Sequence, residues 1–202
     1  MASVPPVRRL VAAVAAATAA LGCSSAMASG GPVSRPAAVT PPKVVRAARI
    51  TRPAGTLAPG SPVQARRVTG QRVFTDARHG VALASVGSAE YAVATSDGGR
   101  TWKTDGPALH LDAAQAPLSV AFIGAVNRRT VFAWGGGQVI DATSDGGRHW
   151  YRALFTTGVP VGVVHDFGGR LVAFVSSSSS GAWQYISRDG GRTWRLQATV
   201  TP

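Results

Sequence analysis

An eight-residue sequence occurs three times along this chain of 202 residues, and it constrains the fold more than any other feature. It reads TSDGGRTW at 95–102, TSDGGRHW at 143–150 and SRDGGRTW at 187–194, so that its aspartates lie 48 and 44 residues apart. Self-similarity at such a period is typical of arrays in which each repeat is one supersecondary unit, such as the blades of a β-propeller.

The segments around each copy have the pattern of short β-strands. A run of small and β-branched residues precedes each copy, another follows it, and two further candidate strands lie upstream in each unit. Glycines separate the runs, and no helical periodicity appears. Four short strands per unit are typical of a propeller blade. We therefore predict an all-β, β-propeller-like domain over 67–202, with about three four-stranded antiparallel blades at about 67–107, 117–155 and 159–202.

The residue types of the repeated sequence suit a tight turn between two strands. An aspartate can accept hydrogen bonds from backbone N–H groups a few residues on, and adjacent glycines supply the positive φ that the turn requires. The hydroxyl residue can bond within the same loop, and the tryptophan can bury its ring beneath it. Because every side chain then has a local partner, we interpret the three copies as structural turns.

The copies resemble the Asp-box, or bacterial neuraminidase repeat, whose pattern is S/T-x-D-x-G-x-T-W. The matching positions are Thr95, Asp97, Gly99, Thr101, Trp102, Thr143, Asp145, Gly147, Trp150, Ser187, Asp189, Gly191, Thr193 and Trp194. His149 departs from the pattern, which has threonine there. The stretch VFTDARHGVALAS at 73–85, followed by the first copy, is also similar to blades of photosystem II assembly and stability factor-like proteins.

The resemblance covers about residues 68–200. It implies propeller blades in which the box joins the last two strands, away from the central pocket. It implies no particular activity, because Asp boxes occur in sialidases, in sortilin-type receptors and in many proteins that are not enzymes.

The other polar residues form no constellation typical of an enzyme. Hydrolysis of a glycoside usually needs two flanking carboxylates, or a tyrosine with an acid partner in sialidases. The only glutamate, Glu90, is next to Tyr91, and neighbours on a strand face opposite sides. Three arginines, Arg100, Arg148 and Arg192, occupy the same position of each turn, so we expect them to spread apart and not to converge on one ligand.

The four histidines lack the spacing of metal ligands, so we interpret them as surface or loop residues. We predict no catalytic, metal-binding or cofactor-binding residue and no cofactor. The chain is then not an enzyme but a binding or scaffold module for a protein or glycan ligand. Two alternatives stay open: a sialidase-like or other glycan-acting hydrolase, and an assembly factor for a membrane complex, which rests on the blade resemblance alone.

Three blades are fewer than the roughly 4–8 of typical propellers. Such an array leaves strand edges open, and association of two copies is a common way to bury them. We therefore expect either a homo-oligomer, in which two copies combine their blades, or an incomplete array.

Residues 1–28 have the pattern of a bacterial export signal. A basic start precedes a run of 13 apolar or small residues at 10–22, which is shorter than the roughly 20 residues that span a bilayer as a helix. Cys23 follows in the sequence ALGC, which resembles a lipobox and makes this cysteine a candidate for lipidation; ordinary cleavage after Ala28 is the alternative. Either event predicts an exported protein, extracellular or anchored at the outer face of the cytoplasmic membrane or cell wall.

Residues 29–66 are rich in proline, alanine, glycine and arginine and lack any regular period, so we predict an extended basic linker. The net charge of +12 arises mainly in the N-terminal part, because ten of the 21 lysines and arginines but none of the nine acids precede Asp76. The repeat region is nearly neutral, which argues against a nucleic-acid partner. Membrane contact is expected only through a lipid anchor or this basic segment.

Overall fold

A computed structural model describes residues 40–111, 118–177 and 181–200, and the predicted export signal with Cys23 lies outside these ranges. The described residues form 14 β-strands and one short 3₁₀ helix, and no α-helix occurs among them. Within these ranges no helix is long and apolar enough to cross a membrane. The predicted all-β class is confirmed.

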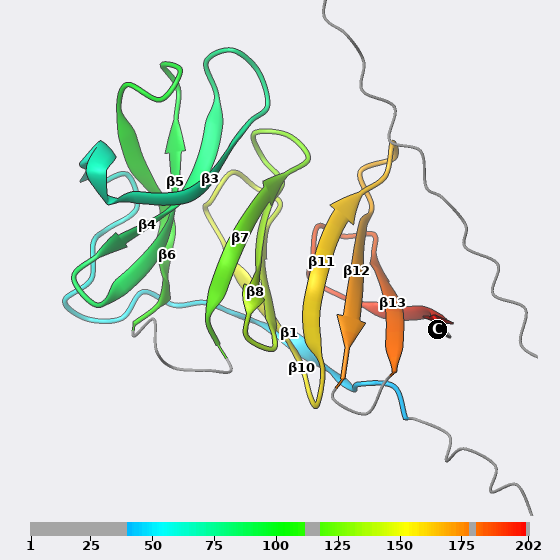
Figure 1. Cartoon of the computed structure of the whole chain (residues 1–202). Coiled ribbons are helices and arrows are strands. Elements are labelled where there is room, and N and C mark those ends of the chain that lie inside the picture. The colour runs from blue at the N-terminus through cyan, green and yellow to red at the C-terminus, as the bar shows by residue number, and fades with distance from the viewer. Residues whose placement is uncertain (1–39, 112–117, 178–180, 201–202) are drawn as a thin grey trace, which may run out of the picture. The chain divides into compact units, whose positions relative to one another are not determined.

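Twelve of the strands form three antiparallel meanders, because each strand pairs with the next one along the chain. Blade 1 consists of β3 (Val68–Phe74), β4 (Gly80–Val86), β5 (Ala89–Thr95) and β6 (Trp102–His110). Blade 2 consists of β7 (Val120–Ala125), β8 (Val131–Gly136), β9 (Val139–Thr143) and β10 (Tyr151–Phe155). Blade 3 consists of β11 (Val159–His165), β12 (Leu171–Ser176), β13 (Ala182–Ser187) and β14 (Arg195–Val200). Figure 1 shows these four-stranded sheets, whose strand order is propeller-like as predicted.

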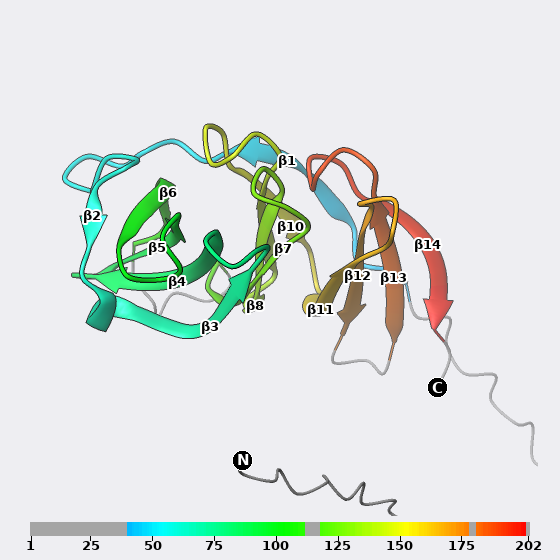
Figure 2. The same cartoon turned by 90° about the horizontal axis from the view of Figure 1, so that it is seen from above.

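The segment before the blades adds a fifth strand to two of them. β1 (Val44–Arg49) pairs antiparallel with β10, and β2 (Pro62–Val63) pairs antiparallel with β6. Figure 2 shows this segment passing from blade 2 to blade 1 along their outer strands, before η1 (Ala65–Arg67) leads into β3. The predicted extended linker over 29–66 is therefore wrong for residues 40–66. An added edge strand is held by backbone hydrogen bonds, which leave no apolar period in the sequence.

Two apolar clusters bury the faces of neighbouring blades against each other. The cluster shared by blades 1 and 2 includes Leu83, Leu109, Ile123, Val139 and Trp150. The cluster shared by blades 2 and 3 includes Ile140, Phe155, Leu171, Trp183 and Tyr185. Side chains alternate across each strand, so Val139 and Ile140, neighbours on β9, face different blades.

A third cluster covers the other face of blade 1 with residues of the N-terminal segment. Leu57 and Val63 pack with Tyr91 and Trp102 of the blade. The Leu57 N–H donates to the Tyr91 hydroxyl at 3.0 Å, and the Thr104 hydroxyl donates to the Ala58 carbonyl at 2.7 Å. One end face of the array is thus covered by the chain itself, as capping segments do in repeat proteins.

Candidate functional site

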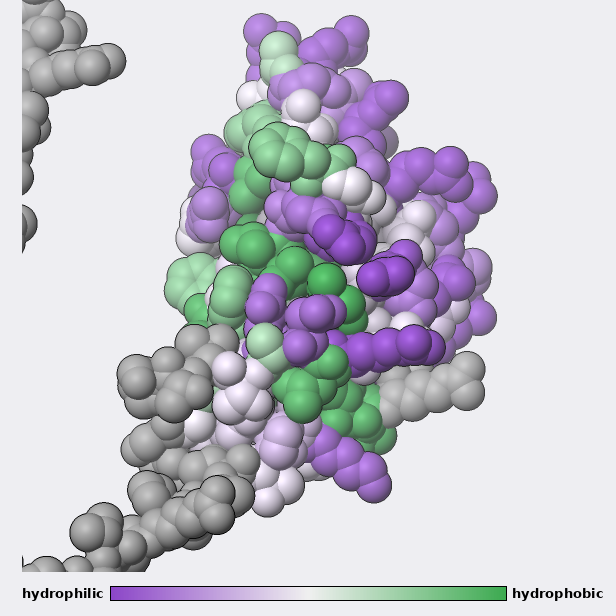
Figure 3. Space-filling model, turned by 90° about the vertical axis from the view of Figure 1, so that its right-hand side faces the viewer, coloured by the Kyte–Doolittle hydropathy of each residue, from purple (hydrophilic) through white to green (hydrophobic). Residues whose placement is uncertain are grey.

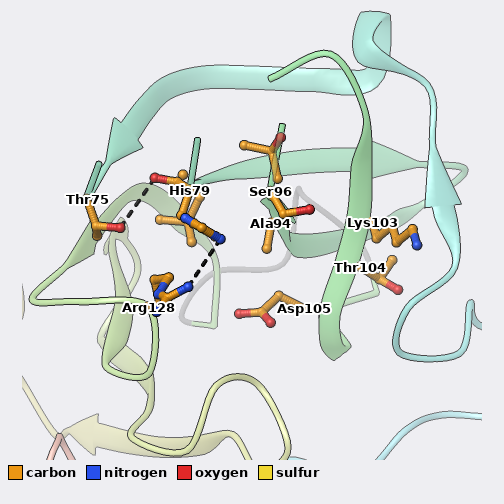
Figure 4. Close-up of a pocket in the computed structure, with 11 residues that line it drawn as sticks. Thr75, His79, Ala94, Ser96, Lys103, Thr104, Asp105 and Arg128 are labelled. Atoms are coloured by element: carbon orange, nitrogen blue, oxygen red, sulfur yellow. Dashed lines mark hydrogen bonds between the residues drawn. The ribbon is translucent and has the colours of Figure 1, made fainter. Parts of the chain in front are cut away.

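A cavity of about 280 Å³ lies where blade 1 meets blade 2. The turn between β3 and β4 contributes His79, the loop after β5 contributes Ser96, and the start of β6 contributes Lys103 and Asp105. Arg128, from the loop between β7 and β8, is the blade 2 residue of the lining (Figure 4). The site therefore exists only when the two blades are packed together.

Two of these residues, His79 and Arg128, form a hydrogen-bonded chain with Asp76, which does not itself line the cavity. Both carboxylate oxygens of Asp76 lie 2.9 Å from Nδ1 of His79, and Arg128 lies 3.2 Å from Nε2 of the same ring. A guanidinium can only donate, so Nε2 accepts in this contact, and the proton that bonds to Asp76 lies on Nδ1. The backbone N–H of Arg78 and the bonds from His79 lower the pKa of Asp76 to about 2. The imidazole is thereby fixed in one tautomer and orientation.

Asp105 is the one acidic residue among the lining residues. Its carboxylate has no hydrogen bond or ion pair within the described part of the chain, and Figure 4 shows it pointing toward Arg128. Burial, with a smaller contribution from the negative charge of Asp145, raises the pKa of Asp105 to about 7. Near neutral pH this group can therefore act as an acceptor or, when protonated, as a donor.

The repeat loop of blade 2 (143–150) fixes the backbone at Asp105. Trp150 Nε1 donates to the Asp105 carbonyl at 2.5 Å. A Cβ at Gly147 would lie 2.4 Å from Asp105 Oδ1, and a Cβ at Gly106 would lie 2.4 Å from Trp150 Cδ1. Both glycines also have positive φ, of 77° and 132°. The close approach of this loop to β6 thus depends on two positions where only glycine fits without strain.

The three repeat loops (95–102, 143–150 and 187–194) share one hydrogen-bond pattern. In the first, the Thr95 hydroxyl donates to Asp97 at 2.8 Å and accepts the Gly99 N–H at 2.9 Å. Asp97 accepts the N–H and the hydroxyl of Thr101 at 2.9 and 2.6 Å, and these bonds hold the pKa of Asp97 well below its usual range.

The same pattern recurs in the other two loops. The third copy uses Ser187, Gly191 and Thr193 around Asp189. In the second, Nδ1 of His149 takes the place of the threonine hydroxyl, 2.6 Å from Asp145 Oδ2. Each aspartate is therefore engaged within its own turn, between the third and fourth strands of its blade.

One expectation for these loops is wrong: not every side chain has a local partner. Trp102 and Trp194 donate to the carbonyls of Gly99 and Gly191 at 3.0 and 3.1 Å, within their own loops. Trp150 instead bonds to blade 1, so the second loop also joins two blades.

The turn arginines lie in three separate blades, and two have distinct surroundings. Arg192 lies 4.8 Å above the ring of Tyr151 in blade 2. Arg100 lines a shallow depression with Arg78 and Asp97.

A second polar cluster is buried between blades 1 and 2. Arg152 donates to both carboxylate oxygens of the fully buried Asp141 at 2.8 and 2.6 Å, and also to the Leu109 carbonyl. Burial raises the pKa of Asp141, and the bonds from Arg152 oppose this. His110, on β6, is only 5% exposed, so its interpretation as a surface or loop histidine is wrong. This cluster joins β6 of blade 1 to β9 and β10 of blade 2.

Sequence reasoning did not identify the cavity residues as a site. His79 and Asp105 are far in the sequence from Arg128, and the three residues match no ligand spacing. The one available signal was a set of acids and histidines not used by the repeat, and nothing in their order indicated that blade packing brings them together. Within the described ranges, no group of three or more His, Cys, Asp or Glu side chains could hold a metal ion.

No protein-family model matches this chain, and no curated protein matches it. Among solved structures, one described as "YCF48 bound to D1 peptide" is similar, with 19% sequence identity and a TM-score of 0.43. The match covers 79% of this chain but 45% of the other, so this chain spans less than half of that chain's length. The propeller-like description given above follows from the strand order and register of the chain itself.

Proposed function

We propose that the chain is an exported bacterial Asp-box repeat protein, acting at the cell envelope as a binding or scaffold module for a protein ligand. The observation that carries the proposal is the cavity between blades 1 and 2, with the unpartnered carboxyl group of Asp105 inside it. A module of this kind needs a rigid site with a few oriented polar groups, and blades joined by an apolar cluster supply one.

The lining groups suit the recognition of polar groups on a ligand. Arg128 offers a cationic donor, Asp105 offers an acceptor or a donor, and the apolar side chains of Val81 and Ala94 complete the wall. Amide, hydroxyl and carboxylate groups all occur along an exposed peptide segment, and each finds a complementary partner here. A glycan is the alternative ligand.

A glycan-acting hydrolase is the second candidate, and the pKa of Asp105 near 7 is the observation that favours it. Hydrolysis by a pair of carboxylates would also need a second free acid. The carboxylate that influences Asp105 belongs to Asp145, whose oxygens already accept bonds from Thr143 and His149. We therefore favour binding over catalysis, and turnover of a fluorogenic sialoside by the purified full-length chain would reverse this preference.

Two neighbouring arginines allow a matched test of the binding site. Arg128 and Arg129 are both exposed on the loop between β7 and β8, but only Arg128 lines the cavity and bonds to His79. Tagged full-length chain purified from its native host after crosslinking should retain a protein partner with Arg129→Ala and lose it with Arg128→Ala. Equal capture by both variants would contradict the proposed site.

Export and anchoring form part of the proposal. The intact mass of the protein recovered from its native host distinguishes a lipidated Cys23 from a chain that begins at Ser29 after cleavage behind Ala28. A recovered protein that still contains residues 1–28 would contradict export through this signal.

A further inference from the structure

Strand addition at the outer edge of a blade occurs twice in this chain. Blade 2 receives β1 against β10, with Val44 opposite Phe155 and Arg49 opposite Tyr151. Blade 1 receives β2 against β6, with Val63 opposite Trp102. In both cases the added strand is antiparallel and comes from a segment outside the blade. The outer edges of these two blades are therefore paired, at least in part.

Blade 3 has four strands, and among the described residues none pairs with the outer side of β14. Residues 195–199 of this strand are all exposed. A row of unpaired backbone N–H and C=O groups on an exposed edge strand is a template for pairing with another extended segment.

The edge strand itself carries one exposed apolar side chain beside basic residues. Leu196 of β14 is 46% exposed, and the exposed Phe174 (40%) and Val164 (51%) lie farther across the sheet, on β12 and β11. Figure 3, which views the molecule from the side of β13 and β14, shows an apolar band bordered by hydrophilic residues. A cavity of about 440 Å³ along β14 is lined in part by Leu196 together with Arg188 and Arg195. An incoming strand would place side chains on both kinds of surface.

The charge of blade 3 indicates the sign of the charge on its partner. Residues 159–200 contain four arginines and two aspartates. Asp166 is paired with Arg170, and Asp189 is occupied by its own turn. Arg188 and Arg195 form no ion pair within the described ranges. A second copy docking through the same face would bring these arginines together, which is unfavourable, whereas an acidic segment would neutralise them.

We propose that β14 binds an extended acidic segment of a partner protein as an antiparallel fifth strand of blade 3. Backbone hydrogen bonds to the edge supply affinity, as in other cases of strand addition. Apolar side chains of the segment pack beside Leu196, and its acidic side chains pair with Arg188 and Arg195. This surface is separate from the cavity between blades 1 and 2, so the proposal holds whether or not that cavity binds a ligand.

The test uses a fluorescein-labelled peptide, Val-Glu-Val-Glu-Val-Glu-Val, and fluorescence anisotropy with the full-length chain. Two further peptides carry N-methyl groups on alternate residues, one set on the odd and one on the even positions. In antiparallel pairing only one set of N–H groups faces the edge, so one N-methylated peptide should bind at least tenfold more weakly and the other as well as the parent. Equal binding of both, or no binding of the parent peptide, would overturn the proposal.

Charge and location are tested in parallel. Arg195→Glu should weaken binding at least tenfold, and Arg100→Glu, an exposed turn arginine of blade 1, should leave it unchanged. Hydrogen exchange should show fast exchange of the outward-facing amides of β14 in the free chain and slow exchange with peptide. Protection already present without peptide would mean that the chain's own N-terminal residues occupy the edge, and protection that rises with protein concentration would mean a second copy; either result refutes a partner segment.

Discussion

Replacing Gly191 with alanine tests whether the repeat loops join blades as well as close turns. Gly191 has a φ of 92°, and a Cβ there would lie 2.4 Å from the Cβ of Ala142. Ala142 is fully buried on β9 of blade 2, so its methyl group cannot move without displacing the strand. Gly99 is the matched control: it occupies the same position of the first loop with a φ of 88°, and the nearest atoms to its added Cβ are 3.5 Å away.

Both substitutions lower stability through backbone strain, and Gly191→Ala lowers it further through overpacking. Placing alanine in the left-handed region costs about 1–2 kcal/mol at either site. Overpacking adds about 1–3 kcal/mol, and only at Gly191. We therefore expect Gly99→Ala to lower the free energy of unfolding by about 1–2 kcal/mol and Gly191→Ala by about 2–5 kcal/mol. Each additional 1 kcal/mol lowers the Tm by about 2–4 °C for a chain of this size.

Thermal and urea denaturation of both variants, followed by tryptophan fluorescence and circular dichroism, gives the comparison. Native-state hydrogen exchange then locates the damage, which for Gly191→Ala should include β9 and β12 at the interface of blades 2 and 3. Equal destabilisation by the two substitutions, or exchange changes confined to the loop itself, would refute the inference that this glycine is required for contact between blades.

Three further predictions concern the interfaces of blade 1. The folded-state pKa of Asp105, about 7, exceeds the value of about 3.9 in an unfolded chain, so wild-type stability falls as pH rises between these values. Relative to wild type, Asp105→Asn should therefore gain up to about 4 kcal/mol in free energy of unfolding between pH 4 and pH 8, measured by urea titration. A stability difference that does not change with pH would contradict the raised pKa of Asp105. Arg152→Met leaves the buried Asp141 unpaired and should lower the free energy of unfolding by about 3–5 kcal/mol. Adding Asp141→Asn should restore part of this loss. If chemical denaturation shows no recovery in the double variant, an uncompensated buried charge is not the cause. Tyr91→Phe removes the acceptor of the Leu57 N–H and should lower the free energy of unfolding by about 1 kcal/mol. Proteolysis near residues 51–61 should become faster. An unchanged cleavage rate would show that this hydrogen bond does not hold the N-terminal segment on blade 1.

The features that could be predicted from the sequence are those built from short-range contacts. In each repeat loop the aspartate bonds to residues at most four positions away, so eight residues contain the whole turn. The strands between the loops carry their own β-propensity, and their count per unit follows from the glycines that separate them. The all-β class and the propeller-like strand order were predictable for this reason.

The candidate site could not be predicted, because its residues meet through contacts between blades. Trp150 and Asp105 are 45 positions apart, and Arg128 and His79 are 49 positions apart. The N-terminal segment was misassigned for a related reason: β1 pairs with residues more than 100 positions away, and its composition resembles a linker. Pairing of this kind is decided by which edge is open, and an open edge is not visible in the sequence of the strand that fills it.

By itself, the sequence determined that this chain forms turns of one kind at three places, each between two strands of an antiparallel unit. Only the tertiary structure decided which carboxylates remain free, which edges are paired and which faces are covered. The physical reason is the range of the interactions. A turn is closed by hydrogen bonds within a few residues, whereas the protonation of Asp105 and the open edge of β14 depend on what other blades and the N-terminal segment leave exposed or bury.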